Sequence, residues 1–421
     1  MSMGFPKKAL VTSNTHLTDT DGKSLRVISL AQLLKSAGFS VTLVVSKCSS
    51  AKAAKFSVVE TKTQLRNTLL DTFPEKVLFF GRQSLRLLAF YLKLLVQGAS
   101  YDIVVSTLVG PEIDSLFACI FSKIKKAHFI YDYDDPSPEI RMLLYKRKND
   151  PRVKLSLFSR EMLVRGASLV FTAANTTRQQ IMEQSKKTKR VYVWYNLPIT
   201  EDMHIDENKE QLRRKLGLNQ KTFIVSYLGN IPNWGIGIII NLLTNCTKKL
   251  KNEEQVIFTI IGGGQWQQPF RELLRRLDLD NHVQITGRQS RRSALEHLVA
   301  SDLSLFPFGF NLVSIYIVPT KLFEAMALGT PVICPRLPDF VRILGDDGIY
   351  FENSIDDLVE KIRWCIRNPE RLGRISLNLK SRFLREYAQE KRSLYMGNIL
   401  KAVSIGSSSS DQKAGLKSET C

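Results

Sequence analysis

The sequence predicts an α/β protein built from two doubly wound parallel sheets. Short apolar runs of the kind that form buried strands alternate with helical patterns along most of the chain, which is typical of parallel sheets with helices on both faces. The alternation is interrupted once, by a polar and charged segment at residues 199–215, and then begins again. A chain of 421 residues is also long for a single core. We therefore expect two domains of similar construction.

The first half of the chain is expected to supply the first sheet. A strand at residues 9–12 precedes a helix at 23–36, and Gly38 is placed to end that helix because glycine tolerates the left-handed conformation. Further strands are expected at residues 41–45, 56–59, 101–107, 128–133, 169–172 and 191–194, with a helix at 111–125.

The second half repeats this pattern. Strands are expected at residues 223–227, 256–261, 283–286, 303–306 and 331–334, and helices at 236–250, 267–277 and about 320–328. Residues 355–403 have a helical pattern, in which 372–400 is long enough to form one extended helix. The last residues, 404–421, are too polar to bury a core and are expected to be disordered.

Composition limits the partners and the compartment. A net charge of +20 with a pI near 9.7 favours anionic partners such as nucleotide diphosphates, phospholipid surfaces or nucleic acid. Nucleic acid is disfavoured, because aromatic residues do not interleave with the basic runs. The scattered cysteines show no metal or disulfide spacing, and the start of the chain does not resemble a signal peptide. We expect a cytoplasmic protein.

Residues 77–96 form the most apolar helical stretch. Arg82, Arg86 and Lys93 interrupt it close to one face, while leucines occupy the others, so it is too charged to span a membrane. Two readings stay open at this point. The helix either lies in an anionic membrane surface, or it is an ordinary buried helix with a basic solvent face.

The most informative segment is V-P-T-K-L-F-E-A-M-A-L-G-T-P-V-I-C-P at residues 318–335. Pro319 stands at an N1-like position of a short helix that Gly329 ends, and a buried strand follows. Glu324 is the one carboxylate of this helix and lies among apolar residues. It either faces solvent, or it binds the hydroxyl groups of a nucleotide whose phosphate lies at the helix N-terminus.

This segment resembles the donor-site motif of family-4 retaining glycosyltransferases, in the subgroup with a P-[ST]-K-x-x-E sequence. The resemblance implies the GT-B fold, in which two Rossmann-like domains face a central cleft and a final helix crosses back to the first domain. The corresponding boundaries here are an acceptor domain at 1–200, a donor domain at 201–384, a crossover helix at 385–403 and the tail at 404–421. By resemblance, Glu324 holds the ribose of a nucleotide sugar.

The resemblance also implies a set of donor-binding residues. Gly22 and Arg26 match a loop that the family places over the donor diphosphate, although Asp21 stands where a second glycine is usual. The other donor-binding residues are expected to be Gly229, Asn230, Gly262, Arg288, Pro319, Thr320, Lys321 and Glu324.

The sequence departs from the family in two places. After Asn230 no basic residue occurs until Lys248, although the family supplies an Arg and a Lys there to neutralise the pyrophosphate. Lys321 and Arg288 are the candidates to replace them. Tyr316 occupies the position of the first Glu of a family Glu pair, which leaves the transferred sugar open.

On the acceptor side, Asp134 and Asp135 follow a strand and resemble a family segment that faces the cleft. They are candidates to orient or deprotonate an acceptor hydroxyl, although Asp before Pro is also a common turn-former. His16 is a further catalytic candidate. We expect no metal site and no cofactor, since the nucleotide sugar is a substrate.

The resulting hypothesis is a retaining, metal-independent hexosyltransferase. Its partners would be a nucleotide-sugar donor, a glycan or lipid-linked acceptor and an anionic membrane, at the inner face of the plasma membrane. The alternative is a catalytically silent GT-B protein that acts as a binding partner in a glycan assembly complex, and a sugar epimerase is a smaller alternative.

Overall fold

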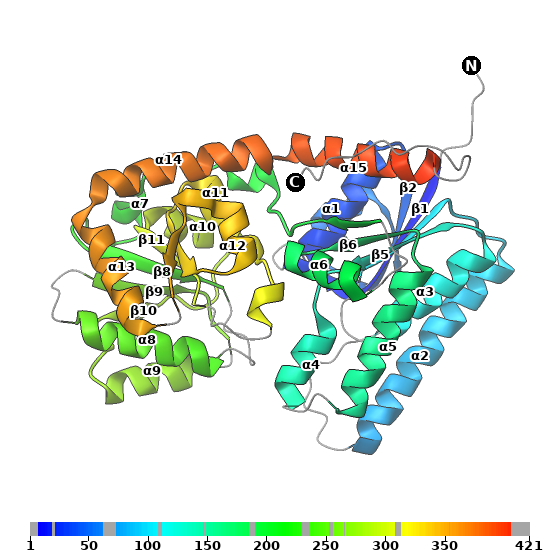
Figure 1. Ribbon diagram of the computed structural model, residues 1–421, viewed down its shortest axis with the longest axis horizontal. Helices are drawn as coiled ribbons and strands as arrows, with labels where there is room; N and C mark the ends of the chain where they lie inside the picture. Colours follow the sequence, from blue (N-terminus) through cyan, green and yellow to red (C-terminus); the bar gives the residue numbers. More distant parts are fainter. Residues whose placement is uncertain are drawn as a thin grey trace. The chain divides into compact units, whose positions relative to one another are not determined.

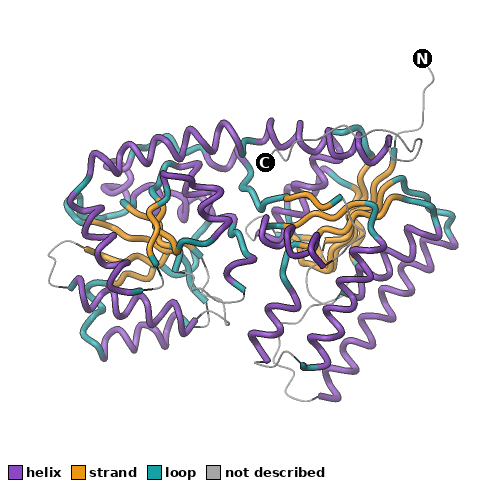
Figure 2. Tube along the Cα trace, in the orientation of Figure 1, coloured by secondary structure: helices purple, strands orange, loops and turns teal. Residues whose placement is uncertain are grey.

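The computed structural model describes residues 7–18, 22–61, 73–107, 112–145, 149–184, 190–229, 236–251, 256–264, 266–307, 313–352 and 354–405. These residues form two compact units, each of which is a parallel sheet covered by helices (Figures 1 and 2). Unit 1 comprises residues 1–196 and 390–421, and unit 2 comprises residues 197–389. The sequence placed the corresponding boundaries at 200/201 and 384/385. The predicted disordered tail lies outside the described residues from residue 406 on.

Unit 1 contains a seven-stranded parallel sheet in the order β3-β2-β1-β4-β5-β6-β7. Its strands are β1 Lys8–Leu17, β2 Ser40–Cys48, β3 Ser57–Glu60, β4 Ile103–Thr107, β5 His128–Tyr133, β6 Leu169–Thr172 and β7 Val191–Val193. Its helices are α1 Gly22–Ser36, η1 Ala51–Lys55, α2 Phe73–Val96, α3 Ile113–Ile124, α4 Ser137–Tyr145, α5 Pro151–Gly166, α6 Asn175–Gln184 and α15 Gln389–Ile405.

Unit 2 contains a six-stranded parallel sheet in the order β10-β9-β8-β11-β12-β13. Its strands are β8 Phe223–Leu228, β9 Val256–Ile261, β10 Val283–Ile285, β11 Leu303–Leu305, β12 Val332–Pro335 and β13 Ile349–Phe351. Its helices are η2 Thr200–Met203, α7 Lys209–Lys215, α8 Ile236–Leu250, α9 Gln267–Arg276, α10 Arg291–Ala300, η3 Ser314–Tyr316, α11 Thr320–Leu328, α12 Pro338–Leu344, η4 Gly345–Asp347, α13 Ile355–Arg367 and α14 Pro369–Glu386.

Both sheets reverse their strand order once. In unit 1 the reversal lies between β1 and β4, and in unit 2 it lies between β8 and β11. Ligands of open α/β sheets bind at the carboxyl ends of the strands beside such a reversal. The loops that follow β1 and β8 are therefore the first places to look for a site.

The core of unit 1 has a cluster on each side of its sheet. One includes residues of α1 and of α15, and the other includes residues of α2, α3 and α5. Met396, Ile399 and Leu400 of α15 are buried in the first cluster. The Arg392 guanidinium lies 4.2 Å from the centre of the Trp194 ring and donates to the Tyr195 carbonyl, which ties α15 to unit 1.

Two expectations about helices need correction. Pro319 is the N-cap residue of α11 rather than its first helical residue, so the helix begins at Thr320. The long helix expected at 372–400 is broken: α14 ends at Glu386 and α15 begins at Gln389, and between them the ring of Tyr387 lies 5.0 Å from that of Phe323. For helix α2, which was left with two readings, Leu85, Leu88 and Leu92 are exposed while Leu87 and Tyr91 are buried. No described helix is both long enough and apolar enough to cross a membrane.

Candidate active site

Helix α11 positions the motif that the sequence analysis singled out. Pro319 caps it with an extended backbone, and Gly329 ends it in the left-handed conformation at φ 74°, as expected. A Cβ at Gly329 would lie 3.1 Å from Ser376 Oγ, so glycine also allows α14 to approach closely. Because α11 follows β11 of a parallel sheet, its N-terminus lies at the carboxyl end of the sheet.

Glu324 does not face solvent. It is only 4% exposed, and Arg291 Nη1 donates to its Oε1 at 3.0 Å. Arg291 also donates from Nε to Asp202 Oδ2 at 3.3 Å. The reading of Glu324 as a solvated surface charge is thus wrong, because a buried carboxylate requires a partner and Arg291 of α10 provides it.

Lys321 lies against the glycines that follow β8 and β9. A Cβ at Gly229 would lie 2.4 Å from Lys321 Cε and 2.7 Å from its Nζ. A Cβ at Gly262 would lie 2.5 Å from the Gly229 carbonyl oxygen. Both glycines have positive φ, 133° and 144°, so the chain needs glycine at both positions for conformation, and at Gly262 also for space because the neighbouring atoms are backbone. The structure thus brings Gly229, Gly262 and Lys321 together, and Lys321 lies one turn before Glu324 on α11.

Burial lowers the pKa of Lys321 from its usual value, and Arg291 lowers it further, while Glu324 acts in the opposite direction. An ammonium group in this setting gains from a nearby anion. Such an anion would favour the charged form of Lys321 and raise its pKa.

Arg288 and Asn230 complete the predicted donor set only in part. Arg288 is exposed, and its backbone nitrogen lies near Gly263, since a Cβ there would be 3.3 Å from it. Within the described residues its guanidinium makes no hydrogen bond or ion pair. Asn230 lies outside the residues that the structure describes, as does the loop from 231 to 235.

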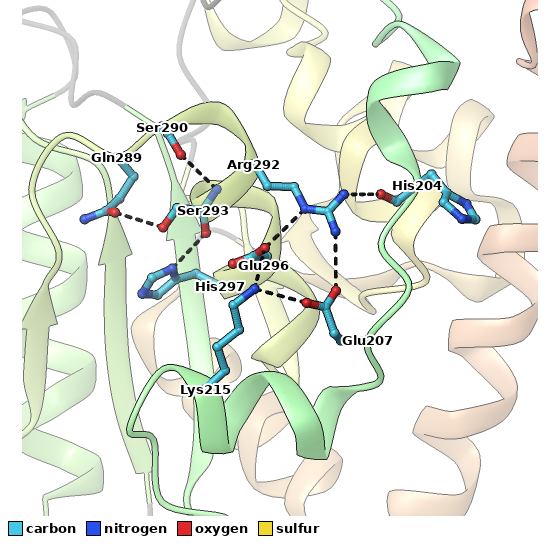
Figure 3. A network of polar contacts seen from close by, with 9 residues as sticks. All are labelled: His204, Glu207, Lys215, Gln289, Ser290, Arg292, Ser293, Glu296 and His297. Carbon is cyan, nitrogen blue, oxygen red and sulfur yellow. Dashed lines mark hydrogen bonds and ion pairs between the residues drawn. The ribbon is translucent and has the colours of Figure 1, made fainter.

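A polar network fixes the segment that carries Asp202 onto α10 (Figure 3). Arg292, next to Arg291, donates to the His204 carbonyl at 2.7 Å and to Glu296 Oε1 at 3.2 Å. Lys215 Nζ joins Glu296 and Glu207 at 2.9 and 3.0 Å, and these contacts lower the pKa values of both carboxyl groups. Burial opposes this effect at Glu296, but the hydrogen bonds prevail.

The start of α10 belongs to the same network. Ser290 caps the helix by accepting from the Ser293 N–H at 3.2 Å, and Ser293 Oγ donates to Gln289 Oε1 at 2.9 Å. His297 Nδ1 lies 2.8 Å from the Ser293 carbonyl. The first turn of α10 is therefore fixed, and with it Arg291.

Arg291 retains one unused donor. Its Nη2 is buried and has no hydrogen-bond partner within the part of the chain that the structure describes. A buried N–H without a partner is costly and marks a place where a ligand oxygen would bind favourably. This donor lies on the same guanidinium that contacts Glu324.

In unit 1, Arg26 occupies the interior rather than a ligand site. Its side chain has no exposed surface, and its Nε donates to Asp132 Oδ2 at 2.8 Å. Its Nη1 donates to the Trp194 carbonyl at 2.6 Å and to Asn196 Oδ1 at 2.7 Å. In this arrangement Arg26 cannot contact a diphosphate directly. The expectation that it binds the donor is therefore corrected, and Arg26 is a residue that positions other side chains.

Arg26 instead helps to hold Asp134. The Arg26 Nε lies 3.7 Å from Asp134 Oδ1, which also accepts from Asn196 Nδ2 at 2.7 Å. Burial nevertheless raises the pKa of Asp134 to about 6, because loss of hydration outweighs the attraction of Arg26. A carboxyl group with this pKa can accept a proton near neutral pH.

The remaining candidates of unit 1 lie at the same sheet edge. Lys23 forms an ion pair with Asp135 at 2.7 Å, and both follow the carboxyl ends of strands. His16 is exposed near the end of β1, where its Nε2 lies 2.9 Å from Ser49 Oγ. Gly22 is the first residue of α1.

The sequence analysis missed Arg291. It is separated from Glu324 by 33 residues, and no local motif links them. The one available signal was the pair Arg291–Arg292 directly after a serine that could cap a helix, in a loop that follows a strand.

Comparisons with known proteins agree with this architecture. Residues 208–382 match the family model of glycosyl transferases group 1. The search of curated proteins found no match.

Several solved structures have the same fold. Sucrose-phosphate synthase (tll1590) from Thermosynechococcus elongatus superposes with a TM-score of 0.72 at 14% identity, covering 95% of this chain and all of that one. Anabaena Alr3699/HepE, solved with UDP, superposes with a TM-score of 0.67 at 17% identity, covering 94% of this chain and all of that one. WaaG, a glycosyltransferase involved in lipopolysaccharide biosynthesis, superposes with a TM-score of 0.66 at 14% identity, covering 93% of this chain and 99% of that one. The chain thus has the two-domain α/β fold of GT-B glycosyltransferases, and its residues 208–382 are similar to the glycosyl transferases group 1 domain.

Proposed function

We propose that the protein is a retaining glycosyltransferase that moves a hexosyl group from a nucleotide sugar to a glycan or lipid-linked acceptor at the cytoplasmic face of the membrane. The observation that carries the proposal is the convergence of Gly229, Gly262, Lys321 and Glu324 after β8, β9 and β11, within the matched domain. Alr3699/HepE, which has the same fold, has been solved with UDP and with UDP-glucose.

Each residue of this group has a chemical role in the proposal. The Glu324 carboxylate accepts hydrogen bonds from the ribose hydroxyls, and the N-terminus of α11 faces the phosphates. Lys321 supplies positive charge where the diphosphate leaves, a task that the sequence left without the usual Arg–Lys pair after Asn230. The Nη2 group of Arg291, which has no partner among the described residues, donates to an oxygen of the nucleotide without giving up an existing hydrogen bond.

In the proposed reaction the bond between the sugar C1 and the phosphate oxygen breaks while the acceptor oxygen binds C1 from the same face. The acceptor proton passes to the leaving phosphate, so no protein nucleophile and no metal are needed. Asp134 and Asp135 orient the acceptor hydroxyl, with Arg26 and Lys23 holding the two carboxyl groups in place. His16 is a further acceptor-side group.

The direct test is donor hydrolysis and nucleotide binding. Purified protein is mixed with radiolabelled UDP- and GDP-sugars, and released sugar is measured beside the dissociation constant for the nucleotide. Glu324→Gln should weaken donor use by about ten- to hundredfold, because it removes a charge-assisted hydrogen bond. Glu272→Gln, at an exposed position on α9 of the same unit, is the matched control and should retain wild-type turnover.

The rival is a catalytically silent scaffold with the same fold. It predicts that no sugar is released from any donor and that Glu324→Gln leaves complex formation unchanged. Failure of every UDP- and GDP-sugar to bind would refute the transferase proposal, whereas binding with release that depends on Glu324 would exclude the scaffold.

A further inference from the structure

Helices α2, α3 and α5 form a continuous layer on one face of the sheet of unit 1. Helix α3 contacts both α2 and α5 (Figure 1). Their inward residues, among them Tyr91, Phe121 and Leu163, belong to one buried cluster against the sheet. Their opposite faces therefore point away from the sheet.

These outward faces carry large apolar side chains. On α2, Leu85, Leu88 and Leu92 are 66%, 38% and 51% exposed, at spacings of three and four residues that align them in one stripe. Further exposed apolar side chains of the layer are Val96 on α2, Ile120 and Ile124 on α3, and Leu155, Phe158 and Met162 on α5. An exposed apolar surface of this extent marks a contact site on a folded protein.

The same layer is strongly basic. Arg82 and Lys93 are exposed on α2, Lys123 on α3 and Lys154 on α5. Among the residues of these helices whose side chains the structure describes, Glu161 is the one exposed carboxylate, and it forms an ion pair with Arg165. Apolar and basic side chains are thus mixed on one face without balancing acids.

We propose that this face, which we call the α2/α3/α5 face, binds the surface of an anionic phospholipid bilayer. Leucine side chains enter the boundary between headgroups and acyl chains, and the basic side chains contact anionic headgroups. A second copy of this chain is a poorer occupant, because two such faces would bring like charges together. The inference does not depend on sugar transfer.

The test is co-sedimentation of the full-length protein with vesicles of phosphatidylcholine alone and of an equal mixture of phosphatidylcholine and phosphatidylglycerol. Binding should require the anionic lipid and should weaken as the NaCl concentration is raised. Equal binding to both vesicle types, or none to either, would overturn the proposal.

The apolar contribution is tested with two double variants. Leu85→Gln/Leu92→Gln should lower vesicle binding at least about tenfold, because both side chains lose their contact with the bilayer. Leu377→Gln/Leu384→Gln on α14, where the leucines are 70% and 54% exposed, is the matched control and should bind as wild type does. Equal losses in both double variants would contradict the assignment of the α2/α3/α5 face.

The charge contribution is tested in the same way. Each basic residue near the membrane surface contributes roughly fivefold to binding, so Arg82→Gln/Lys93→Gln should lower vesicle binding at least about tenfold. Arg275→Gln/Arg276→Gln removes the same charge from exposed positions on α9 and should have little effect.

Two further readouts separate the alternatives. Sedimentation velocity without lipid should show a monomer, and a dimer that only the α2 variants dissociate would instead identify a second copy as the occupant. Glu324→Gln should bind vesicles as wild type does. Failure of the glycosyltransferase proposal would thus leave this result unchanged.

Discussion

The contact between Arg291 and Glu324 offers the sharpest test of the donor-site geometry. We consider Arg291→Gln, Glu324→Gln and the double variant as a double-mutant cycle. Arg291→Gln removes the ion-pair partner of the Glu324 carboxylate, which is only 4% exposed, and leaves Lys321 as the cation that still interacts with it. The double variant removes both charges and leaves two amides that can bond to each other.

The structure sets the expected size of these effects. Two unit charges separated by the 3.0 Å between Arg291 Nη1 and Glu324 Oε1 attract by about 5 kcal/mol at an effective dielectric constant of about 20. The side chain of Arg291 is 18% exposed, so water recovers part of this energy. We expect Arg291→Gln to lower the free energy of unfolding of unit 2 by about 3 kcal/mol.

Glu324→Gln should cost less, about 1–2 kcal/mol, because Arg291 keeps its contact with Asp202. The double variant should be about 2 kcal/mol more stable than the sum of the single losses predicts. This coupling energy is the quantity that measures the ion pair.

Hydrogen exchange of the buried strands β8 and β12 measures the stability of unit 2 separately from unit 1. Arg276→Gln, at an exposed position on α9, is the control for loss of one positive charge and should change stability by less than about 0.5 kcal/mol. Additive single losses, or an Arg291→Gln variant as stable as the control, would refute the buried pair.

Three other predictions concern titration and close packing. Burial raises the pKa of Asp114 to about 6, so the stability that its protonation contributes is present below pH 4 and is lost as the pH rises through 6. The free energy of unfolding of Asp114→Asn should therefore rise relative to that of wild type by up to about 3 kcal/mol between pH 4 and pH 7, measured by urea unfolding. A difference that does not depend on pH would contradict the shift. Gly262→Ala should lower the free energy of unfolding by about 2 kcal/mol or more, because its methyl group would meet the Gly229 carbonyl. In the control Gly237→Ala on α8, the methyl group meets no atom within 4 Å, so this variant should be neutral or slightly stabilising in thermal unfolding. UDP binding at alkaline pH should take up protons through Lys321, because its pKa is lowered in the free protein and a bound diphosphate would raise it. Calorimetry in buffers of different ionisation enthalpy measures this uptake, which should vanish in Lys321→Met.

Local sequence patterns predicted the elements well where burial and backbone chemistry act within a few residues. The apolar run at 128–133 is β5, and the runs at 169–172 and 256–261 are β6 and β9. Gly329 was expected to end its helix and does so with positive φ. In each case the deciding interaction lies within one strand or one helical turn.

The misses have a common physical origin in contacts between distant parts of the chain. Arg26 was expected at a ligand, but Asp132 lies 106 residues away in sequence and pairs with it in the interior. Periodicity on α2 separated apolar from basic faces correctly, yet it could not show that the leucines remain exposed after folding. The break at Tyr387 coincides with a ring contact to Phe323, a residue that no pattern within 372–400 contains.

Polar contacts also hold the chain on both sides of residues 197–199, where it passes from unit 1 to unit 2. On one side, Arg392 holds the Tyr195 carbonyl and Arg26 holds the Asn196 side chain, both within unit 1. On the other side, Asp202 is bound to α10 within unit 2. The fixed φ of Pro198 removes one of the few rotations left at residues 197–199. The first torsions on the unit 2 side of residues 197–199 therefore lead directly into η2, whose Asp202 contacts the same Arg291 that holds Glu324.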